Sequence, residues 1–398
     1  MNIIIPKDVQ FIIDTFYKNG YEAFMVGGCV RDSLLNRNPQ DFDITTSATP
    51  DITQSLFDKT IPTGIKHGTI TVLINNIPYE VTTYRIEEEY KDNRRPDKVN
   101  FVTNVKEDLS RRDFTINAFA YNSKIGLKDY FQGIEDLNNK IIRTVGVASD
   151  RFTEDALRML RAIRFSSQLN FSIEAKTYDA ILNNYKLILN ISIERITSEF
   201  TKILLSPNAY KGLSILDDTN ILNLIIPDLT KYSFNDIDKL PLDLSTRLAF
   251  ILINTDLPTS NKILKNLRFD NKTIEKSLLL IREFNELSFC KSKIHCKKVI
   301  NKVGRENIYY LLHIYEVLNK YHNVQVIKSY IDSIINNNET LFIKELNIDG
   351  KILKNEIPNI SGKEIGNTLT HLLNLVIEEK ILNNASDLIL EAKKYINK

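Results

Sequence analysis

Apolar and polar positions alternate over short distances in the first 140 residues of the chain. Strand-length apolar runs predict β-strands near residues 24–26, 42–44, 69–74 and 79–83. Asn75-Asn76, between the last two runs, predicts a tight hairpin turn. The first run leads through Gly27-Gly28 into a helical pattern from Arg31. This part is therefore expected to be an α/β domain that begins with a strand, a glycine turn and a helix.

Beyond residue 140 the apolar positions follow helical spacing, and strand patterns are scarce. Runs such as residues 278–281 fit the buried faces of helices. Breaks near Pro207, Pro227, Pro258 and residues 336–338 predict boundaries between helical modules. The fold class that we predict is α+β, with an N-terminal α/β head followed by an all-helical remainder.

Residues 86–98, with the sequence IEEEYKDNRRPDK, form a charged stretch between two strand-like segments. The stretch holds one proline and has no amphipathic period, so we expect a mobile loop that leaves the sheet and returns. Arg94 and Arg95 within it either contact RNA or stay solvated, and we favour the contact with RNA.

Composition places the chain among ordinary soluble proteins of two to four domains. It has 398 residues, of which 43% are apolar and 26% are charged, and no apolar run approaches the roughly 20 residues that span a bilayer. The N-terminus lacks the features of a secretion signal, and three cysteines are too few for a disulfide framework. Cys290, His295 and Cys296 match no zinc-binding spacing, so we expect structural roles for them. A cytoplasmic location with no membrane contact is expected.

Charge is informative through its distribution rather than its sum. The net charge of +2 neither requires nor excludes a nucleic-acid partner, but 13 of the 17 arginines lie at or before Arg195. Arginine recognises phosphates and bases with a planar, bidentate group, whereas lysine offers a point charge. The first half of the chain is therefore expected to carry the chemistry, and the lysine-rich second half to be a scaffold with a basic surface.

The first candidate site combines the Gly27-Gly28 turn with Asp41 and Asp43. Glycines at a strand-to-helix turn let backbone N–H groups approach an anion, and two carboxylates on one face of a strand suit two metal ions. A Gly-Gly pair alone is most often only a turn, and an Asp-x-Asp sequence alone is most often a solvated loop or a cap. Together the two features indicate nucleotidyl transfer. Glu80 on a neighbouring predicted strand is either a third metal-binding carboxylate or a solvent-facing residue.

The second candidate site is a set of arginines and an acid on a predicted helix. Asp155, Arg158, Arg161 and Arg164 follow one another at steps of three, which on one helix makes Asp155 and Arg158 direct neighbours and puts Arg164 nearly opposite Asp155. The alternative is an ordinary ion pair between Asp155 and Arg158 with solvated arginines. Arg112 in the earlier segment Arg111–Ala118 is a further candidate contact for a triphosphate or a base.

These motifs, in this order, resemble those of the class II tRNA nucleotidyltransferases, the bacterial and eukaryotic CCA-adding enzymes with bacterial poly(A) polymerases as relatives. Further resemblance lies in Asp129-x-x-x-Gly133-x-x-Asp136, in Ser192-x-Glu194-Arg195 with Glu199, and in the glycine-containing segments 348–350 and 362–366. It covers most of the chain and is strongest over residues 21–204. The resemblance implies a polymerase-β-like head over residues 1–140, a helical neck over 141–205, a body over 206–300 and a tail over 301–398.

The resemblance also assigns roles to single residues. It implies that Asp41 and Asp43 bind Mg²⁺, that Gly28, Arg31 and Arg112 hold the incoming nucleotide, that Asp155 and Arg158 read its base, and that Arg161 and Arg164 add nucleotide contacts. The expected reaction extends the 3′ end of tRNA with CTP and ATP, without a nucleic-acid template. A homodimer is compatible with the sequence. The alternatives are an enzyme that adds only A, a poly(A) polymerase, an enzyme that adds only CC, and a non-catalytic RNA-binding protein. The presence of residues 87–98 argues against an enzyme that adds only CC, because family members of that type lack part of this stretch.

Overall fold

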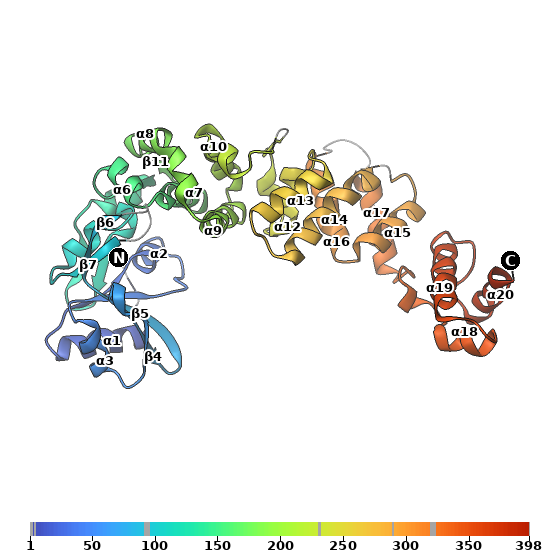
Figure 1. Ribbon diagram of the computed structural model, residues 1–398, viewed down its shortest axis with the longest axis horizontal. Helices are drawn as coiled ribbons and strands as arrows, with labels where there is room; N and C mark the ends of the chain where they lie inside the picture. The colour runs from blue at the N-terminus through green and yellow to red at the C-terminus, as the bar shows by residue number, and fades with distance from the viewer. Residues whose placement is uncertain are drawn as a thin grey trace. The chain divides into compact units, whose positions relative to one another are not determined.

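The computed structural model describes residue 3 and residues 5–90, 96–229, 232–288, 290–318 and 324–397. The chain folds as two compact units, residues 1–227 and residues 228–398. The first contains a sheet followed by helices, and in the second all elements among the described residues are helices (Figure 1). The predicted α+β class is therefore confirmed, and the predicted break near Pro227 coincides with the boundary between the units.

The first unit is built on a seven-stranded mixed sheet. Its strand order is β3 (Thr60–Gly64), β4 (Thr69–Ile74), β5 (Ile77–Thr83), β2 (Asp43–Thr46), β1 (Ala23–Val26), β8 (Phe119–Asn122) and β9 (Gly126–Asp129). Only β2 and β5 are parallel neighbours; the other pairs are antiparallel. The predicted hairpin between β4 and β5 is confirmed, and both of its turn residues, Asn75 and Asn76, have positive φ, as a tight hairpin turn requires.

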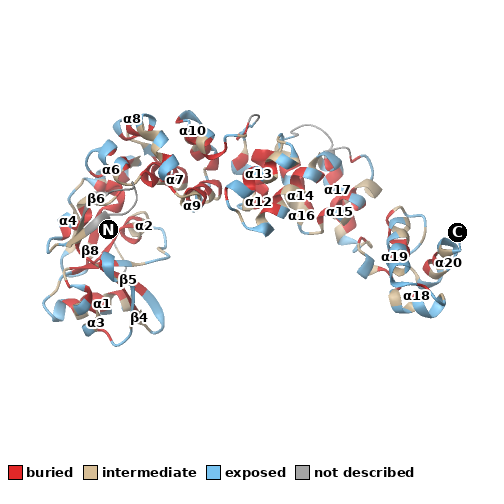
Figure 2. Cartoon of the chain, viewed as in Figure 1, coloured by how far each residue is buried: buried red, intermediate tan, exposed pale blue. Residues whose placement is uncertain are grey.

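Strand β1 is buried along its whole length because both faces of the sheet are covered there. Figure 2 shows the buried residues of both units in red. On one side the apolar face of α1 (Lys7–Lys18) packs in a core that includes Ala23 of β1. On the other side Phe24 and Val26 pack with Val105 and Leu109 of α4 (Val105–Ser110). A strand buried on both faces reads as a continuous apolar run, which explains why its position could be predicted.

The prediction of a loop over residues 86–98 is wrong for residues 86–90 and 96–98, and residues 91–95 lie outside the described residues. Strands β6 (Arg85–Tyr90) and β7 (Pro96–Phe101) pair antiparallel as a separate two-stranded sheet. A two-stranded ribbon forms through backbone hydrogen bonds and does not require the amphipathic period on which the prediction depended. Arg94 and Arg95 lie outside the described residues.

Helices complete both units. Those of the first unit are α1, α2 (Gly28–Leu34), α3 (Pro50–Leu56), α4, α5 (Gly133–Asn139), α6 (Ala148–Glu154), α7 (Leu157–Leu169), α8 (Ala175–Asn184), α9 (Ile193–Leu204), α10 (Ala209–Asp218) and α11 (Ile221–Ile225). Those of the second are α12 (Leu244–Leu252), α13 (Leu257–Asn266), α14 (Asn271–Ser288), α15 (Lys293–Val303), α16 (Asn307–Leu318), α17 (Val324–Asn336), α18 (Gly350–Glu356), α19 (Gly362–Ile377) and α20 (Ala385–Ile396). No helix among the described residues is long and apolar enough to cross a bilayer.

Candidate functional site

The glycine turn is in contact with the side chain of Arg112. Strand β1 ends at Val26, Gly27 has a φ of 77°, and α2 starts at Gly28. A Cβ on Gly27 would lie 2.8 Å from Nη1 of Arg112, so the guanidinium group rests against the turn. The turn needs glycine for two reasons, because a side chain would be strained at this φ and would displace Arg112. The Nε of Arg112 is buried and has no hydrogen-bond partner among the described residues.

Asp43 lies close to the glycine turn because β1 pairs with β2. Asp43 lies opposite Val26, the last residue before the glycine turn. Its surroundings raise the pKa of Asp43 by desolvation, the Arg112 charge opposes this, and the Asp41 charge raises the pKa further. The side chain nevertheless keeps an exposed surface. A partly desolvated carboxylate that feels a second acid is the arrangement that a cation would stabilise.

One part of the carboxylate prediction needs correction. Strand β2 begins at Asp43, so Asp41 lies before the strand rather than on it. The pairing stops there because its partner β1 ends at Val26, where the chain turns at Gly27. On the neighbouring parallel strand Glu80 is exposed, one residue before Val81, which pairs with Ile44. No group of three acids, cysteines or histidines among the described residues is arranged to hold a metal.

Arg31 is held in place by a chain of side chains that starts on α2. It donates from Nε and Nη2 to Asp32 and from Nη1 to Oδ1 of Asn117, at 2.7 Å. Asn117 donates in turn to Asp113, 3.1 Å away. Asp113 accepts from Nε of Arg161 on α7, also at 2.7 Å. Arg31 and Arg161, which are 130 positions apart in the sequence, thus share one hydrogen-bonded network.

The acid at the centre of this network is strongly stabilised in its charged form. Burial alone would raise the pKa of Asp113, but the Arg161 charge and hydrogen bonds from Asn117 and Arg161 overcome it and hold the pKa at about 2. The same pairing with Asp113 raises the pKa of Arg161. Both groups therefore stay ionised throughout the neutral range.

Arg164 lies on the same helix and has a different acid. Its Nε is 2.9 Å from Oε2 of Glu199 on α9, and both side chains are almost fully buried. Burial lowers the pKa of Arg164 to about 10, with the nearby charges of Arg161 and Arg31 acting in the same direction and that of Glu199 opposing it. Burial and the neighbouring arginines both disfavour the charged form of Arg164, so a bound anion beside it would be stabilising.

Asp155 and Arg158 do not form the pair that one continuous helix would give. Helix α6 ends at Glu154, Asp155 has extended backbone angles, and α7 starts at Leu157. Asp155 instead accepts from Arg195 on α9 at 2.7 Å, and Arg158 bonds to Glu154. The predicted helical geometry is therefore wrong at Asp155, and so is the alternative of an Asp155–Arg158 ion pair.

The break between α6 and α7 has a local explanation. Oδ1 of Asp155 accepts from the backbone N–H of Leu157, two residues on. A side chain that satisfies a backbone donor in this way competes with helix continuation and favours a turn. Arg158 also donates to the backbone oxygens of Arg151 and Arg111, which ties α7 to the preceding helix and to the Arg112 segment.

Several residues of this site were not among the predicted contacts, although the motifs contain them. Asp113 and Asn117 lie in the segment that was singled out for Arg112, and Arg195 and Glu199 lie in the motif near residue 195. Asn117, Asp113 and Glu199 each hold an arginine that was predicted to contact the nucleotide, and Arg195 holds Asp155, which was predicted to read the base. The available signal was the presence of unassigned acids and amides within arginine-rich motifs.

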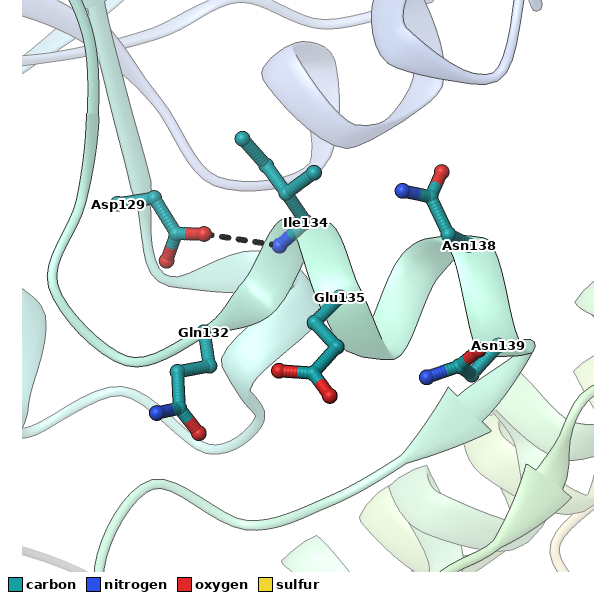
Figure 3. A pocket seen from close by; sticks show the side chains of 6 residues that line it. All are labelled: Asp129, Gln132, Ile134, Glu135, Asn138 and Asn139. Carbon is teal, nitrogen blue, oxygen red and sulfur yellow. Dashed lines mark hydrogen bonds between the residues drawn. The ribbon is translucent and has the colours of Figure 1, made fainter.

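The segment from Asp129 to Asp136 has a structural role. Its acid Asp129 accepts from the backbone N–H groups of Phe131, Gly133 and Ile134. The hollow beside it is lined by Asp129, Gln132 and, from α5, Ile134, Glu135, Asn138 and Asn139 (Figure 3). A Cβ on Gly133 would lie 2.4 Å from the Thr115 carbonyl oxygen, and Asp136 accepts from the Thr115 hydroxyl at 2.7 Å. This close packing fixes the turn Thr115–Asn117, which carries the partner of Arg31.

Comparison with known families covers the chain in three consecutive parts. Residues 23–143 match the poly A polymerase head domain, residues 170–233 match the RNA and SrmB-binding site of polymerase A, and residues 245–392 match tRNA nucleotidyltransferase domain 2. The first match contains the glycine turn, both aspartates and Arg112.

Similar proteins match over almost the whole length. A CCA-adding enzyme of Staphylococcus aureus is 37% identical over 385 residues, which are 95% of each chain. One of Staphylococcus haemolyticus is 38% identical over 394 residues, 97% of this chain and 96% of the other.

Solved structures show the same fold. The CCA-adding enzyme of Bacillus stearothermophilus in complex with CTP superposes with a TM-score of 0.81 at 28% identity, covering 99% of this chain and 98% of the other. The Thermotoga maritima CCA-adding enzyme complexed with tRNA has a TM-score of 0.74 at 21% identity, covering 99% and 97%. Together with the ordered motifs and the staphylococcal relatives, these matches show that the chain belongs to the CCA-adding enzymes of the tRNA nucleotidyltransferase family.

Proposed function

We propose that this protein completes the 3′ end of tRNA by adding C, C and A from CTP and ATP, with release of pyrophosphate and without a nucleic-acid template. The observation that carries the proposal is the corner at which the Asp43 carboxylate, the Gly27 turn and the Arg112 guanidinium group meet. An acid for a cation and a donor for an anion lie side by side there, as transfer of a nucleotide from its triphosphate requires. Membership of the family supports the same reaction.

Mg²⁺ fits the two aspartates of this corner. Asp41 and Asp43 are exposed, and the charge of Asp41 raises the pKa of Asp43. Mg²⁺ is commonly held by one or two carboxylates, and water and substrate phosphates complete its octahedron, so a third protein ligand is not required. When bound, Mg²⁺ would lower the pKa of the attacking ribose hydroxyl and neutralise charge on the leaving pyrophosphate.

The arginines of the first unit would hold the nucleotide. Arg112 has a buried Nε without a hydrogen-bond partner among the described residues, and its Nη1 lies against Gly27. Arg31, Arg161 and Arg164 form a second group whose mutual repulsion an anion would relieve. Their long side chains are already fixed by Asn117, Asp113 and Glu199, so binding would not require them to be ordered first.

Asp155 and Arg158 would select the base. Cytosine and adenine both present an amino donor beside a ring-nitrogen acceptor, whereas guanine and uracil present a carbonyl acceptor beside an N–H donor. An ionised carboxylate can only accept and a guanidinium group can only donate, so the two side chains match C and A and oppose G and U. Arg195 and Glu154 orient them in the absence of nucleotide. A wrong base would leave desolvated groups unmet, at a cost of about 1–3 kcal/mol each.

The metal assignment is tested by Asp41→Asn and Asp43→Asn, with Asp58→Asn as the control because Asp58 is an exposed aspartate of the same unit. We expect both site variants to lower nucleotide incorporation in Mg²⁺ by orders of magnitude while the dissociation constant for tRNA stays close to that of the wild type. The control variant should match the wild type in both measurements. Near-normal incorporation by either site variant would refute the assignment.

A further inference from the structure

Phe165 is a buried aromatic residue that neither the motifs nor the proposed mechanism uses. Its side chain is buried on α7 at 6% exposure, next to Arg164 in the sequence. The charged carbons of three guanidinium groups lie within cation–π distance of its ring centroid: Arg164 at 4.1 Å, Arg31 at 5.0 Å and Arg161 at 5.4 Å. The other cation–π contacts place one or two cations on a ring, as on Tyr130, Tyr17 and Phe342.

The three arginines come from two different elements. Arg31 belongs to α2, which follows the glycine turn, whereas Arg161 and Arg164 belong to α7. Like charges at this spacing repel one another, and this repulsion contributes to the lowered pKa of Arg164. The face of an aromatic ring carries negative quadrupole potential and attracts guanidinium groups most strongly where water is excluded. Phe165 thus supplies an attraction that all three share.

Hydrogen bonds join two of the three arginines, because Asn117 and Asp113 link Arg31 to Arg161, whereas Arg164 pairs with Glu199. Asp32, Asp113 and Glu199 each pair with one of the three, and they lie on separate elements. Every guanidinium group has five N–H donors, and its acid engages only some of them. Asp113, for example, accepts from Nε and Nη2 of Arg161. The acids therefore set the orientation of each arginine and leave donor capacity for an anion, while the ring holds the three groups around one point.

We infer that Phe165 is a positioning residue, whose ring gathers Arg31, Arg161 and Arg164 into one binding group for the polyphosphate of the incoming nucleotide. This inference rests on the proposed function, because it takes the nucleotide as the anion. The ring would act through the arginines, without touching the nucleotide itself. Its contribution should therefore grow with the number of phosphates and should not depend on the base.

The experiment compares Phe165→Leu with Phe114→Leu in the full-length protein. Phe114 is a matched control because its buried ring contacts that of Phe165 edge to face, with 5.8 Å between centroids, and none of the described cations lies over it. Both variants lose an aromatic ring from the same part of the core. Binding of CTP and of CMP is measured by calorimetry without tRNA, and a thermal melt reports the fold of each variant.

We expect Phe165→Leu to raise the dissociation constant for CTP about tenfold and that for CMP by less than about threefold. Phe165→Tyr keeps the ring and should restore the affinity for CTP. Phe114→Leu should leave the ratio of the two dissociation constants at the wild-type value, even if its melting temperature falls as far. Equal losses for CTP and CMP in Phe165→Leu, or the same ratio in both leucine variants, would overturn the inference.

A second measurement avoids any failure of the leucine variant to fold. Phenylalanine analogues with increasing numbers of fluorine atoms keep the shape of the ring and weaken its negative face. Placed at position 165, the series should weaken CTP binding stepwise, and at position 114 it should have no such trend. A flat response at position 165 would overturn the inference alone. If the wild type binds no CTP, the proposed function itself is wrong, and the inference falls with it.

Discussion

Replacement of Asp113 by asparagine tests whether the buried network that joins Arg31 to Arg161 stabilises the first unit. The pKa of Asp113 falls from 3.8 to about 2 because Arg161 and Asn117 outweigh the effect of burial. The carboxylate therefore binds a proton less readily in the folded state than in the unfolded state. The difference corresponds to about 2 kcal/mol of stability at pH 7.

The pH dependence of this contribution has a definite sign. A depressed pKa in the folded state stabilises the fold at pH values above the unfolded pKa of 3.8, and the stabilisation is lost as the pH falls through the folded pKa of about 2. Asp113→Asn should therefore be less stable than the wild type by about 2 kcal/mol at pH 7 and by about half of that at pH 3. Asp113→Ala, which leaves Arg161 without its partner, should cost about 3–5 kcal/mol.

Urea unfolding followed by far-UV circular dichroism measures the effect, since the chain has no tryptophan to report by fluorescence. The two units can unfold in separate steps, so the change in the free energy of unfolding is taken from the transition that the variant alters. Asp58→Asn, an exposed aspartate of the same unit, should change stability by less than about 0.5 kcal/mol. A difference for Asp113→Asn that is as small as this control, or one that is equal at pH 7 and pH 3, would refute the reasoning.

Three further predictions concern the nucleotide site. Gly27→Ala should raise the KM for CTP and ATP, because its Cβ would lie 2.8 Å from a guanidinium nitrogen of Arg112. Gly126→Ala is the control, since Gly126 also has a positive φ but its Cβ would have nothing within 4 Å, so this variant should show the backbone strain alone. Equal KM values for the two variants in kinetic assays would contradict this prediction. Asp155→Ala and Arg158→Ala should relax discrimination against UTP and GTP as well as slow correct addition, measured as kcat/KM for all four nucleotides; a proportional loss for all four would mean that neither residue selects the base. Shortening residues 87–98 should spare the addition of C and impair the final A, and an equal loss of both in incorporation assays would indicate a general role in folding or RNA binding.

Sequence patterns predicted the elements whose signals are local. Strand β1 is a continuous apolar run, and the β4–β5 hairpin is marked by two asparagines that tolerate positive φ. The same reasoning failed for β6 and β7, whose charged sequence has no apolar alternation. It also failed at Asp155, where a bond from the side chain to the backbone interrupts the expected helix.

The partners of the site residues could not be predicted because they depend on tertiary contacts. Arg31 meets Asn117 only because β1 pairs with β8, and the turn that carries Asn117 precedes β8. Arg164 meets Glu199 because α7 packs against α9. Arg164 pairs with an acid other than Asp155, and nothing in the sequence identified which acid it would find.

The most direct measurement of the central claim uses one tRNA prepared in three forms, which lack the last three, the last two or only the last nucleotide. Each is incubated with the purified protein, Mg²⁺ and labelled CTP, ATP or both, and the products are resolved at single-nucleotide length. The proposed function predicts C, C and A on the first form, C and A on the second, and one A on the third, after which extension stops. Addition of A alone to every form, a growing tail of A, or no addition at all would contradict it.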